Sequence, residues 1–268
     1  MTGDVLIEEL YQMHDFTESH TLQRTVWHMT PGECILPHIM KAASMNGGVV
    51  IGAKCDGRLV GFCFGFPARR GDSWWLWSFV TGVDPDFQGQ GIGYRLKQAQ
   101  RVWAREHGYA WIGWTFDPLQ RGNANFNFNR LGVIVRSYHV DFYGPMSDGI
   151  NTGLASDRFE ALWNVSDNRR TECDRTGSAQ VEHPRQVFLV QTDERGTLIQ
   201  SDAASWDAEA YAVEIPYDIG TLKHNNLDRA IQWQLTFRDT VQQALAAGYV
   251  VDGFVIQPPR CWYVLRRP

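Results

Sequence analysis

A glycine-rich turn that runs from a strand directly into a helix is the feature that most constrains the fold of this chain. The preceding segment, Ser73–Val83, reads as a long strand that Pro85 ends, because proline cannot donate to a sheet ladder. The turn follows as Gln88-Gly89-Gln90-Gly91-Ile92-Gly93, and a helix with one apolar face begins within it. Such a turn offers unpaired N–H groups and the positive end of a helix dipole, which together suit a pyrophosphate.

Two common phosphate-binding motifs do not fit this turn. It is not a Walker A loop, because no Gly-Lys-Ser/Thr follows it. It is not the dinucleotide fingerprint either, since that motif needs an acidic residue after a second strand, where Gly113 stands and Asp117 comes too late. A Rossmann domain is therefore disfavoured.

Composition bounds the function classes. The chain has 268 residues, 44% of them hydrophobic, which is enough for one large domain or two small ones. Its net charge of −5 argues against binding through nucleic-acid phosphates. Charges interrupt every apolar run short of the roughly 20 residues of a membrane span, and the amino terminus is acidic where a signal peptide is basic.

The cysteines and histidines predict neither disulfides nor a metal site. The five cysteines are widely spaced and form no C-x-x-C pair, and none of the eight histidines stands at ligand spacing from another histidine or a cysteine. We therefore expect a cytoplasmic protein without a bound metal.

The pattern of the first half predicts alternating helices and strands. Leu6, Leu10, Met13 and Phe16 recur at helical spacing, so the first 45 residues favour helix, loop, helix. A hairpin is expected over Val49–Pro67, around an Asp-Gly turn. After the glycine turn and its helix, the expected elements are a strand Ala110–Phe116, a helix around Asn123–Leu131 and a strand Val133–Val140.

The second half predicts a strand-rich region with one long helix. Polar loops are expected at 146–156 and 168–185, a turn at 194–196 and a helix at 227–246. Strands are expected at 158–165, 187–191, 197–200, 211–216, 249–256 and 262–265. The closing order of helix, glycine, strand, turn and strand repeats the order that ends the first half, so a degenerate duplication is an open alternative.

The strand, turn and helix resemble the acyl-CoA-binding motif of the GNAT acyltransferase superfamily, Q/R-x-x-G-x-G/A after a strand ending in V-x-P. The order of elements over roughly residues 5–145 agrees. The resemblance implies an α/β (α+β) fold with a mixed, mostly antiparallel sheet flanked by helices. It implies a GNAT domain at 1–145 and an extension at 146–268, and segments such as 116–132 and 156–159 are similar to a subgroup with that extension. The extension would share the sheet or fold as a degenerate half-GNAT lobe over the substrate cleft.

The resemblance implies an acyl-CoA-dependent N-acyltransferase that moves an acetyl or succinyl group to the amine of a small molecule, such as an amino acid. Acetyl-CoA or another acyl-CoA would be the co-substrate. No metal, nucleic acid or membrane partner is expected, and a homodimer is left open. Two alternatives remain: a non-catalytic acyl-CoA-binding or regulatory protein, and a GNAT-like domain that assists a partner through loop 168–185.

The resemblance also assigns the coenzyme-binding positions. The backbone groups of Thr81 and Val83 would pair with the pantetheine arm. Asn123 and the helix after it, which contains Phe128, would lie along that arm. The pyrophosphate would be held by the turn, Gln88, Gly89, Gln90, Gly91, Ile92 and Gly93.

The catalytic groups are less defined by the motif. Many GNAT enzymes protonate the leaving thiolate with a tyrosine, but Phe128 stands at that position and has no proton to give. Tyr143 or Tyr138 could replace it, or water could protonate a thiolate whose pKa is near 8.5. Asp117 is the candidate base, with a turn-capping role before Pro118 as the alternative.

Arg238 is the candidate for binding an anionic substrate. On a helical wheel it falls, with Gln234, within an expected apolar stripe formed by Leu227, Ile231, Leu235, Val241 and Leu245. An arginine on a buried face needs a carboxylate or a ligand. The alternatives are a salt bridge to Asp228, Asp239 or a residue elsewhere in the chain, and a side chain that extends along the helix to reach solvent.

Overall fold

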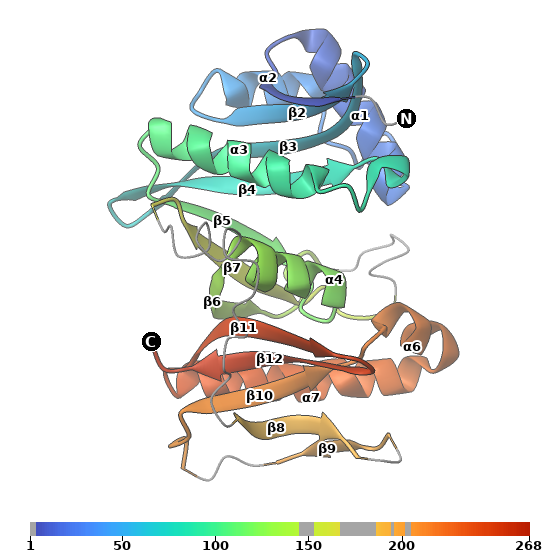
Figure 1. The fold of residues 1–268 in the computed structure, drawn as a ribbon, viewed down its shortest axis with the longest axis vertical. Helices are drawn as coiled ribbons and strands as arrows, with labels where there is room; N and C mark the ends of the chain where they lie inside the picture. The colour runs from blue at the N-terminus through green and yellow to red at the C-terminus, as the bar shows by residue number, and fades with distance from the viewer. Residues whose placement is uncertain (1–3, 145–152, 167–185, 194–195, 202–204) are drawn as a thin grey trace. The chain divides into compact units, whose positions relative to one another are not determined.

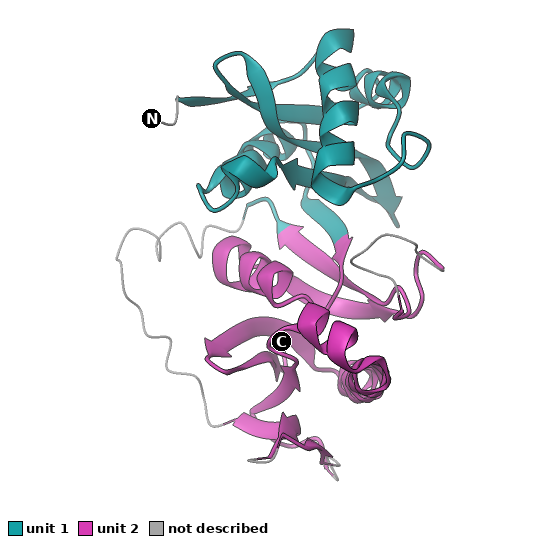
Figure 2. Cartoon of the chain, turned by 90° about the vertical axis from the view of Figure 1, so that its right-hand side faces the viewer, with its two compact units in different colours: residues 1–114, 164–166 teal, residues 115–163, 167–268 magenta. Residues whose placement is uncertain are grey.

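The computed structural model describes residues 4–144, 153–166, 186–193, 196–201 and 205–268. The chain divides into two compact units (Figure 2). Unit 1 comprises Met1–Trp114 and Asn164–Ser166, and unit 2 comprises Thr115–Trp163 and Asp167–Pro268. Each unit has its own strands and helices and is described by itself.

Unit 1 is built on strands that pair in sequence order (Figure 1). They are β1 (Val5–Glu9), β2 (Val49–Cys55), β3 (Arg58–Arg70), β4 (Ser73–Val83) and β5 (Trp111–Phe116). The first four are antiparallel, and β5 runs parallel to β4. Asp56 and Gly57 both have positive φ between β2 and β3, which confirms the Asp-Gly hairpin predicted from the sequence.

The helices of unit 1 are α1 (Met13–Trp27), α2 (Pro37–Ser44) and α3 (Ile92–Glu106). Alternation along β3 separates two faces of the sheet. Phe62 and Phe64 belong to the apolar core that contains Phe16 of α1 and Met40 of α2. The residues that alternate with these phenylalanines, Gly61, Cys63 and Gly65, face α3, and a Cβ at Gly61 would lie 3.2 Å from a methyl group of Leu96. The missing side chain lets α3 pack close to the sheet.

The prediction of a helix at the start of the chain is wrong for the residues before Met13. Val5–Glu9 is a strand, β1, which pairs with β2 from Val5↔Cys55 to Glu9↔Ile51. Its residues satisfy their backbone groups on the edge of β2, a partner about 45 residues away in the sequence that local periodicity does not reveal. The helix begins only at Met13.

In the part of unit 2 that the structure describes there are a strand-rich region and three helical segments. Its helices are α4 (Arg121–Ala124), continued by the π-helical turn η2 (Asn125–Leu131), then α6 (Ile219–Asn225) and α7 (Leu227–Ala246). Its strands are β6 (Ile134–His139), β7 (Arg158–Asn164), β8 (Gln186–Thr192), β9 (Leu198–Gln200), β10 (Ala210–Ile215), β11 (Val250–Gln257) and β12 (Arg260–Arg266). Their order is β7-β6-β11-β12-β10-β8-β9, antiparallel except between β8 and β10.

The predicted fold class is confirmed: mixed α/β, with mostly antiparallel strands flanked by helices. The boundary between compact units falls in β5, whereas the domain division predicted from the sequence falls at 145–146. Residues 145–152, 167–185 and 194–195 lie outside the described residues, and with them that boundary, the charged loop and part of the expected turn. The two-domain division therefore stays a prediction. Among the helices that are described, none has both the length and the apolar character needed to cross a bilayer.

Helix α7 has the predicted bounds but a different buried face. Leu227 and Leu235, expected in the apolar stripe, are 43% and 45% exposed. The buried face is instead formed by Ala230, Trp233, Gln234, Phe237, Thr240, Val241 and Ala244. Burying the two aromatic rings removes more apolar surface from water than burying the two leucines, and the alanines allow close packing around them.

Gly48 allows a close backbone approach between β2, β3 and α2. A Cβ at this position would lie 2.7 Å from the carbonyl oxygen of Gly65 and 2.8 Å from that of Ala43. We expect Gly48→Ala to destabilise the protein by about 2 kcal/mol, because backbone atoms cannot move aside as a side chain can. Urea denaturation measures the effect. Gly32→Ala is the control, since nothing lies within 4 Å of that position; equal midpoints for both variants would contradict the prediction.

Candidate active site

The glycine turn adopts a backbone shape that suits glycine. Gly89 and Gly91 have φ values of +76° and +78°, in the left-handed region. Gly91 is the N-cap of α3 and has no side chain to cap it. The N–H of Arg95 donates to the carbonyl of Gly91 at 3.1 Å, so the N–H groups of Ile92 and Gly93 lie ahead of the helical ladder.

Side chains on one side of the turn hold its shape. Gln88 Nε2 donates to the carbonyl of Val83 at 3.0 Å, which ties the turn to the end of β4. Asp84 accepts from the N–H of Asp86 at 3.1 Å at the start of a short 3-10 turn, and it forms an ion pair with Arg58. These contacts hold the turn against the end of β4.

The space beside the turn is open. A Cβ at Gly89 or Gly91 would meet nothing within 4 Å, and one at Gly93 would meet only a Val83 methyl group, at 3.8 Å. Open space, free helix-terminal N–H groups and the positive end of the α3 dipole coincide here. This arrangement fits a diphosphate.

One edge of β4 continues past its parallel partner. The ladder with β5 has three pairs, Trp75↔Trp111 to Trp77↔Gly113, whereas β4 runs on to Val83. On the other edge, Thr81 and Val83 pair with Cys63 and Gly61 of β3. An extended chain can bind such an edge by main-chain hydrogen bonds.

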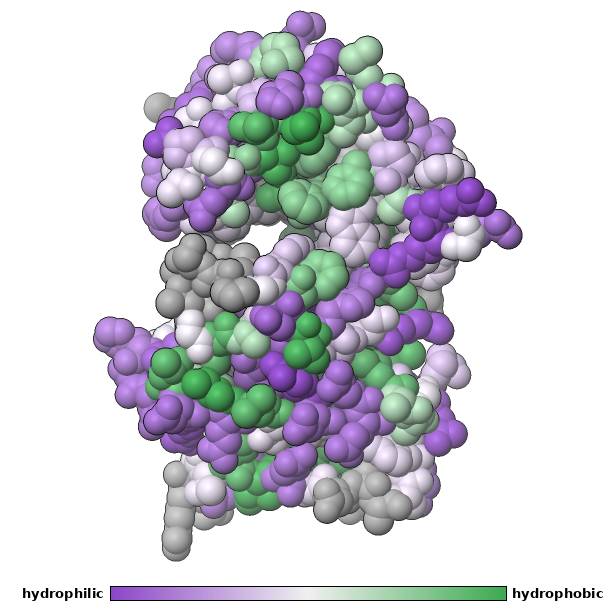
Figure 3. Space-filling model, turned by 180° about the vertical axis from the view of Figure 1, so that it is seen from behind, coloured by the Kyte–Doolittle hydropathy of each residue, from purple (hydrophilic) through white to green (hydrophobic). Residues whose placement is uncertain are grey.

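A register shift in the β3–β4 pair leaves Phe79 as an extra residue on β4. Its ring lies 5.7 Å from that of Phe66 and is 46% exposed. Exposed apolar side chains of unit 1 also include Leu36 and Ile39, and Figure 3 shows apolar side chains gathered on this unit when it is seen from behind.

A buried lysine lies under α3. The side chain of Lys97 is on the sheet side of the helix, and the residue is 3% exposed. Its Nζ donates to Ser78 Oγ at 2.8 Å and to Gln100 Oε1 at 3.0 Å, and lies 3.9 Å from the centre of the Trp114 ring. Burial lowers the pKa of Lys97 from its usual 10.5 to about 7.

In unit 2, the two residues expected along the pantetheine arm differ in exposure. Asn123 is exposed at the start of the helical segment. Phe128 is fully buried and packs edge-to-face against Phe116 and Tyr263, with ring centres 6.2 and 5.6 Å away. Phe128 therefore has a packing role, and its contact with a coenzyme stays a prediction.

Asp117, the candidate base, caps the turn that follows β5. One carboxylate oxygen accepts from the N–H of Leu119 at 2.8 Å and the other from Gln120 Nε2 at 3.3 Å. Burial raises the pKa of this carboxyl, and the hydrogen bond from Leu119 opposes the rise. The turn-capping alternative is thus present in the structure, and a catalytic role stays a prediction.

The two candidate acids have different surroundings. Tyr143 is 45% exposed, and its hydroxyl lies 2.9 Å from Thr115 Oγ1. The hydroxyl of Tyr138 donates to Asp157 at 2.5 Å, and burial together with that carboxylate raises the pKa of Tyr138. Tyr138 is therefore part of a hydrogen-bonded network, whereas Tyr143 is accessible.

A comparison with protein families found a match that includes the glycine turn. Residues 8–130 match the model of the acetyltransferase (GNAT) family. These residues are a GNAT acetyltransferase domain. The chain is therefore an enzyme of the acyltransferase class, with more than a hundred residues beyond the matched region.

Solved structures to which part of the chain is similar include several acetyltransferases. The ribosomal-protein-S18-alanine N-acetyltransferase of Escherichia coli is 15% identical, with a TM-score of 0.48, over 61% of this chain and 96% of that one. A GNAT acetyltransferase of Streptococcus pneumoniae is 13% identical, with a TM-score of 0.47, over 60% and 99%. An aminoglycoside acetyltransferase from an uncultured soil sample is 20% identical, with a TM-score of 0.42, over 46% and 84%. No curated protein matched the chain.

The glycine turn and the other candidate residues belong to different units. The turn with Thr81 and Val83 lies in unit 1, and Asp117, Asn123, Phe128, Tyr143 and Arg238 lie in unit 2. Sequence reasoning missed Lys97. Its signal was available, because Ile92, Leu96, Gln100 and Trp103 recur at helical spacing on the side of α3 that Lys97 shares.

Arg238 forms the salt bridge that the sequence left as an alternative. Its Nε and one terminal nitrogen donate to the two carboxylate oxygens of Asp157, at 2.9 and 3.0 Å. Asp157 is 1% exposed and also accepts from the Asp141 N–H at 3.0 Å. Gln234, one turn earlier on α7, binds the N–H and carbonyl of Ala155. Substrate binding by Arg238 therefore stays a prediction for a guanidinium that already has a carboxylate partner.

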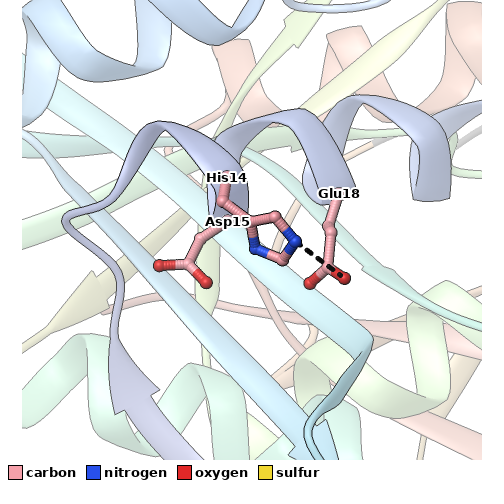
Figure 4. A group of neighbouring side chains, drawn as sticks. All are labelled: His14, Asp15 and Glu18. Carbon is pink, nitrogen blue, oxygen red and sulfur yellow. Dashed lines mark ion pairs between the residues drawn. The ribbon is translucent and has the colours of Figure 1, made fainter.

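One group of side chains has the composition of a metal site. His14, Asp15 and Glu18 of α1 place possible ligand atoms within 4.8 Å of one another (Figure 4). Asp15 is 2.9 Å from Lys54 Nζ, and His14 is 3.8 Å from Glu18. Ion pairing accounts for this arrangement, and we assign no metal to it.

Loss of the salt bridge between Arg238 and Asp157 is expected to lower the stability of the folded protein. We expect Arg238→Ala to lower the free energy of unfolding by about 3 kcal/mol, because it leaves a buried carboxylate without its cation. Chemical denaturation measures this, with Arg136→Ala, an exposed arginine on β6, as the control. Adding Asp157→Asn should recover part of the loss. Unchanged stability in Arg238→Ala would show that the bridge does not hold α7 in place.

The lowered pKa of Lys97 predicts that the stability of the folded protein depends on pH. Between its folded pKa of about 7 and its usual 10.5, the unfolded chain binds more protons, so stability rises with pH across this window. Below pH 7 the full cost of burying the ammonium is present. We expect Lys97→Met to raise the melting temperature by roughly 3 °C at pH 6 and by less at pH 9. Lys41→Met, a change at the surface of α2, should show no such trend; a pH-independent effect of Lys97→Met would refute the assignment.

Proposed function

We propose that this enzyme is an acyl-CoA-dependent N-acyltransferase that transfers an acyl group from coenzyme A directly to the amine of a small molecule. The observation that carries the proposal is the turn before α3. Two left-handed glycines, Gly89 and Gly91, border open space at a helix N-terminus, beside the edge of β4. Backbone N–H groups there would hold the coenzyme's diphosphate.

The pantetheine arm would extend along β4. Main-chain groups of Thr81 and Val83 on the edge beyond Trp77 would pair with its amides, as an added strand pairs with a sheet edge. Binding the arm as well as the diphosphate fixes the thioester in position. Fixed orientation of two reactants is a large part of the rate gain in group transfer.

The reaction needs little covalent chemistry from the protein. The neutral amine attacks the thioester carbonyl and the new C–N bond forms. The C–S bond then breaks, coenzyme A leaves as a thiolate, and the nitrogen loses one proton to solvent as the amide forms. We propose Tyr143 as the group that protonates this thiolate, because this residue is 45% exposed and carries a hydroxyl group. Water is the alternative donor, since a thiol has a pKa near 8.5.

Asp117 is the proposed base for the acceptor's ammonium. Its raised pKa brings the carboxyl closer to the range in which a base works at neutral pH. Its hydrogen bonds with Leu119 and Gln120 would fix its orientation. Acetyl-CoA is the proposed first co-substrate, and succinyl-CoA is the second to test.

A non-catalytic acyl-CoA-binding protein is the competing function, and Phe128 is the observation that favours it. Turnover of acetyl-CoA and succinyl-CoA against a panel of amino acids and small amines, followed by release of free thiol, separates the two. Thiol release that depends on an amine supports the enzyme. Coenzyme binding without release supports the binding protein.

The turn yields a direct binding test. We expect Gly91→Glu to weaken binding of acetyl-CoA at least 100-fold in calorimetric titration, because a carboxylate would occupy the space meant for a diphosphate. Gly108→Glu is a matched control: this glycine follows the other end of α3, with the same φ of +78° and nothing within 4 Å. Both variants bear the same strain and the same added charge. Equal affinities in the two would overturn the coenzyme site.

A further inference from the structure

Phe79 is an exposed aromatic residue of β4 that the proposed function does not use. The register shift between β3 and β4 makes it the extra residue of a bulge, and 46% of it is exposed. Bulges re-aim side chains and are common beside active sites. The pairing of β4 with β5 ends at Trp77, two residues earlier, so the bulge stands where the two strands stop pairing.

The proposed binding mode of the coenzyme leads its acyl end toward Phe79. The diphosphate would lie at the glycine turn, and the pantetheine arm beside Val83 and then Thr81. Phe79 is two residues further along the same strand, which is about 7 Å. From Trp77 onward the edge of β4 is occupied by β5. The thioester would therefore lie near Phe79, where the free part of the edge ends.

The two faces of β4 differ at this point. On one face, Ser78 is 4% exposed beneath α3, and its hydroxyl accepts a hydrogen bond from Lys97 at 2.8 Å. On the other face, the ring centre of Phe79 lies 6.5 Å from that of Phe64 and 5.7 Å from that of Phe66. Because α3 covers the first face, an acceptor would approach the thioester from the face of Phe79.

The face of Phe79 presents apolar side chains. Phe66 is partly buried against the core that contains Met40 of α2, so α2 packs on this face. Leu36 and Ile39, at the start of α2, are 42% and 50% exposed. Apolar side chains gather on this unit in the view of Figure 3. Such a surface favours a ligand with an apolar group, and aromatic rings favour a second ring or an ammonium group on their faces.

We propose that Phe79 determines acceptor specificity, and that the acceptor is a primary amine that carries an aromatic or large apolar group. The inference rests on the proposed function and names the substrate class of the same site. Phe79 binds the apolar group of the acceptor by ring contact and by removing apolar surface from water, and it transfers no proton. A short amine without such a group gains nothing from this contact.

The expected size follows from known discrimination by apolar contacts. One methylene group in an apolar pocket changes kcat/KM by about 10- to 200-fold. The contact with Phe79 is more open than a closed pocket. We therefore expect a phenyl group on the amine to raise kcat/KM at least tenfold, and Phe79→Ala to remove most of that gain.

The experiment compares two primary amines, 2-phenylethylamine and ethylamine, as acceptors with acetyl-CoA in the full chain. Release of free thiol gives kcat/KM for each amine, and calorimetric titration gives the affinity for acetyl-CoA. The variants are Phe79→Ala and Phe79→Leu, which keeps an apolar side chain. Trp74→Ala is the control, because Trp74 is an aromatic residue at the start of β4 that is 55% exposed.

A preference for 2-phenylethylamine that is lost in Phe79→Ala, and kept in Trp74→Ala and partly in Phe79→Leu, supports the proposal, provided that ethylamine turnover and acetyl-CoA affinity are unchanged. Equal kcat/KM for the two amines in the natural protein overturns it and leaves the proposed function intact. A preference that persists in Phe79→Ala, or an equal loss for both amines, also overturns it. No binding of acetyl-CoA, or binding without turnover of any amine, refutes the proposed function, and this inference with it.

Discussion

The close contact between α3 and β3 is the constraint on which the arrangement of unit 1 depends. Gly61 and Gly65 present no side chain to the helix, and a Cβ at Gly65 would lie 3.1 Å from Gln100 Nε2. Because α3 begins at the glycine turn, its distance from the sheet also sets where the turn lies relative to the end of β4. The same contact excludes water from Lys97. The absence of side chains at these two glycines thus links the position of the glycine turn to a buried lysine.

Elements whose ends are marked by nearby residues in the sequence were predicted correctly. The segment Ser73–Val83 and the helix at 227–246 have the bounds read from the sequence, because proline, glycine and long periodic runs mark their ends. The helix predicted over Val5–Glu9 was wrong, because these residues form a strand whose stability comes from pairing with β2, which no window of neighbouring residues contains. The prediction of which face of α7 is buried was wrong, because that face depends on the surface against which the helix packs. The buried face contains the large aromatic residues Trp233 and Phe237.

The candidate site was predictable to a similar degree. The turn could be predicted from its glycines, because they permit the left-handed backbone that Gly89 and Gly91 adopt. The sequence also showed that Arg238 needs a charged partner. It could not show which residue that is, because Asp157 lies 81 residues away. Phe128 could be recognised as unable to donate a proton, whereas its enclosure by Phe116 and Tyr263 required the folded chain.

The three glycines of the turn are not equivalent, and this bears on how the sequence can change over evolution. Gly91 combines a positive φ with open space around it in which the proposed ligand would bind, so we expect no other residue there among active relatives. Gly89 has a similar φ but needs only a residue that tolerates it, and asparagine can. Gly93 is helical, with no positive φ, so alanine would fit and favour the helix. The G-x-G/A form of the family motif thus follows from backbone geometry: its invariant letter stands where the chain is left-handed, and its variable letter where the helix has begun.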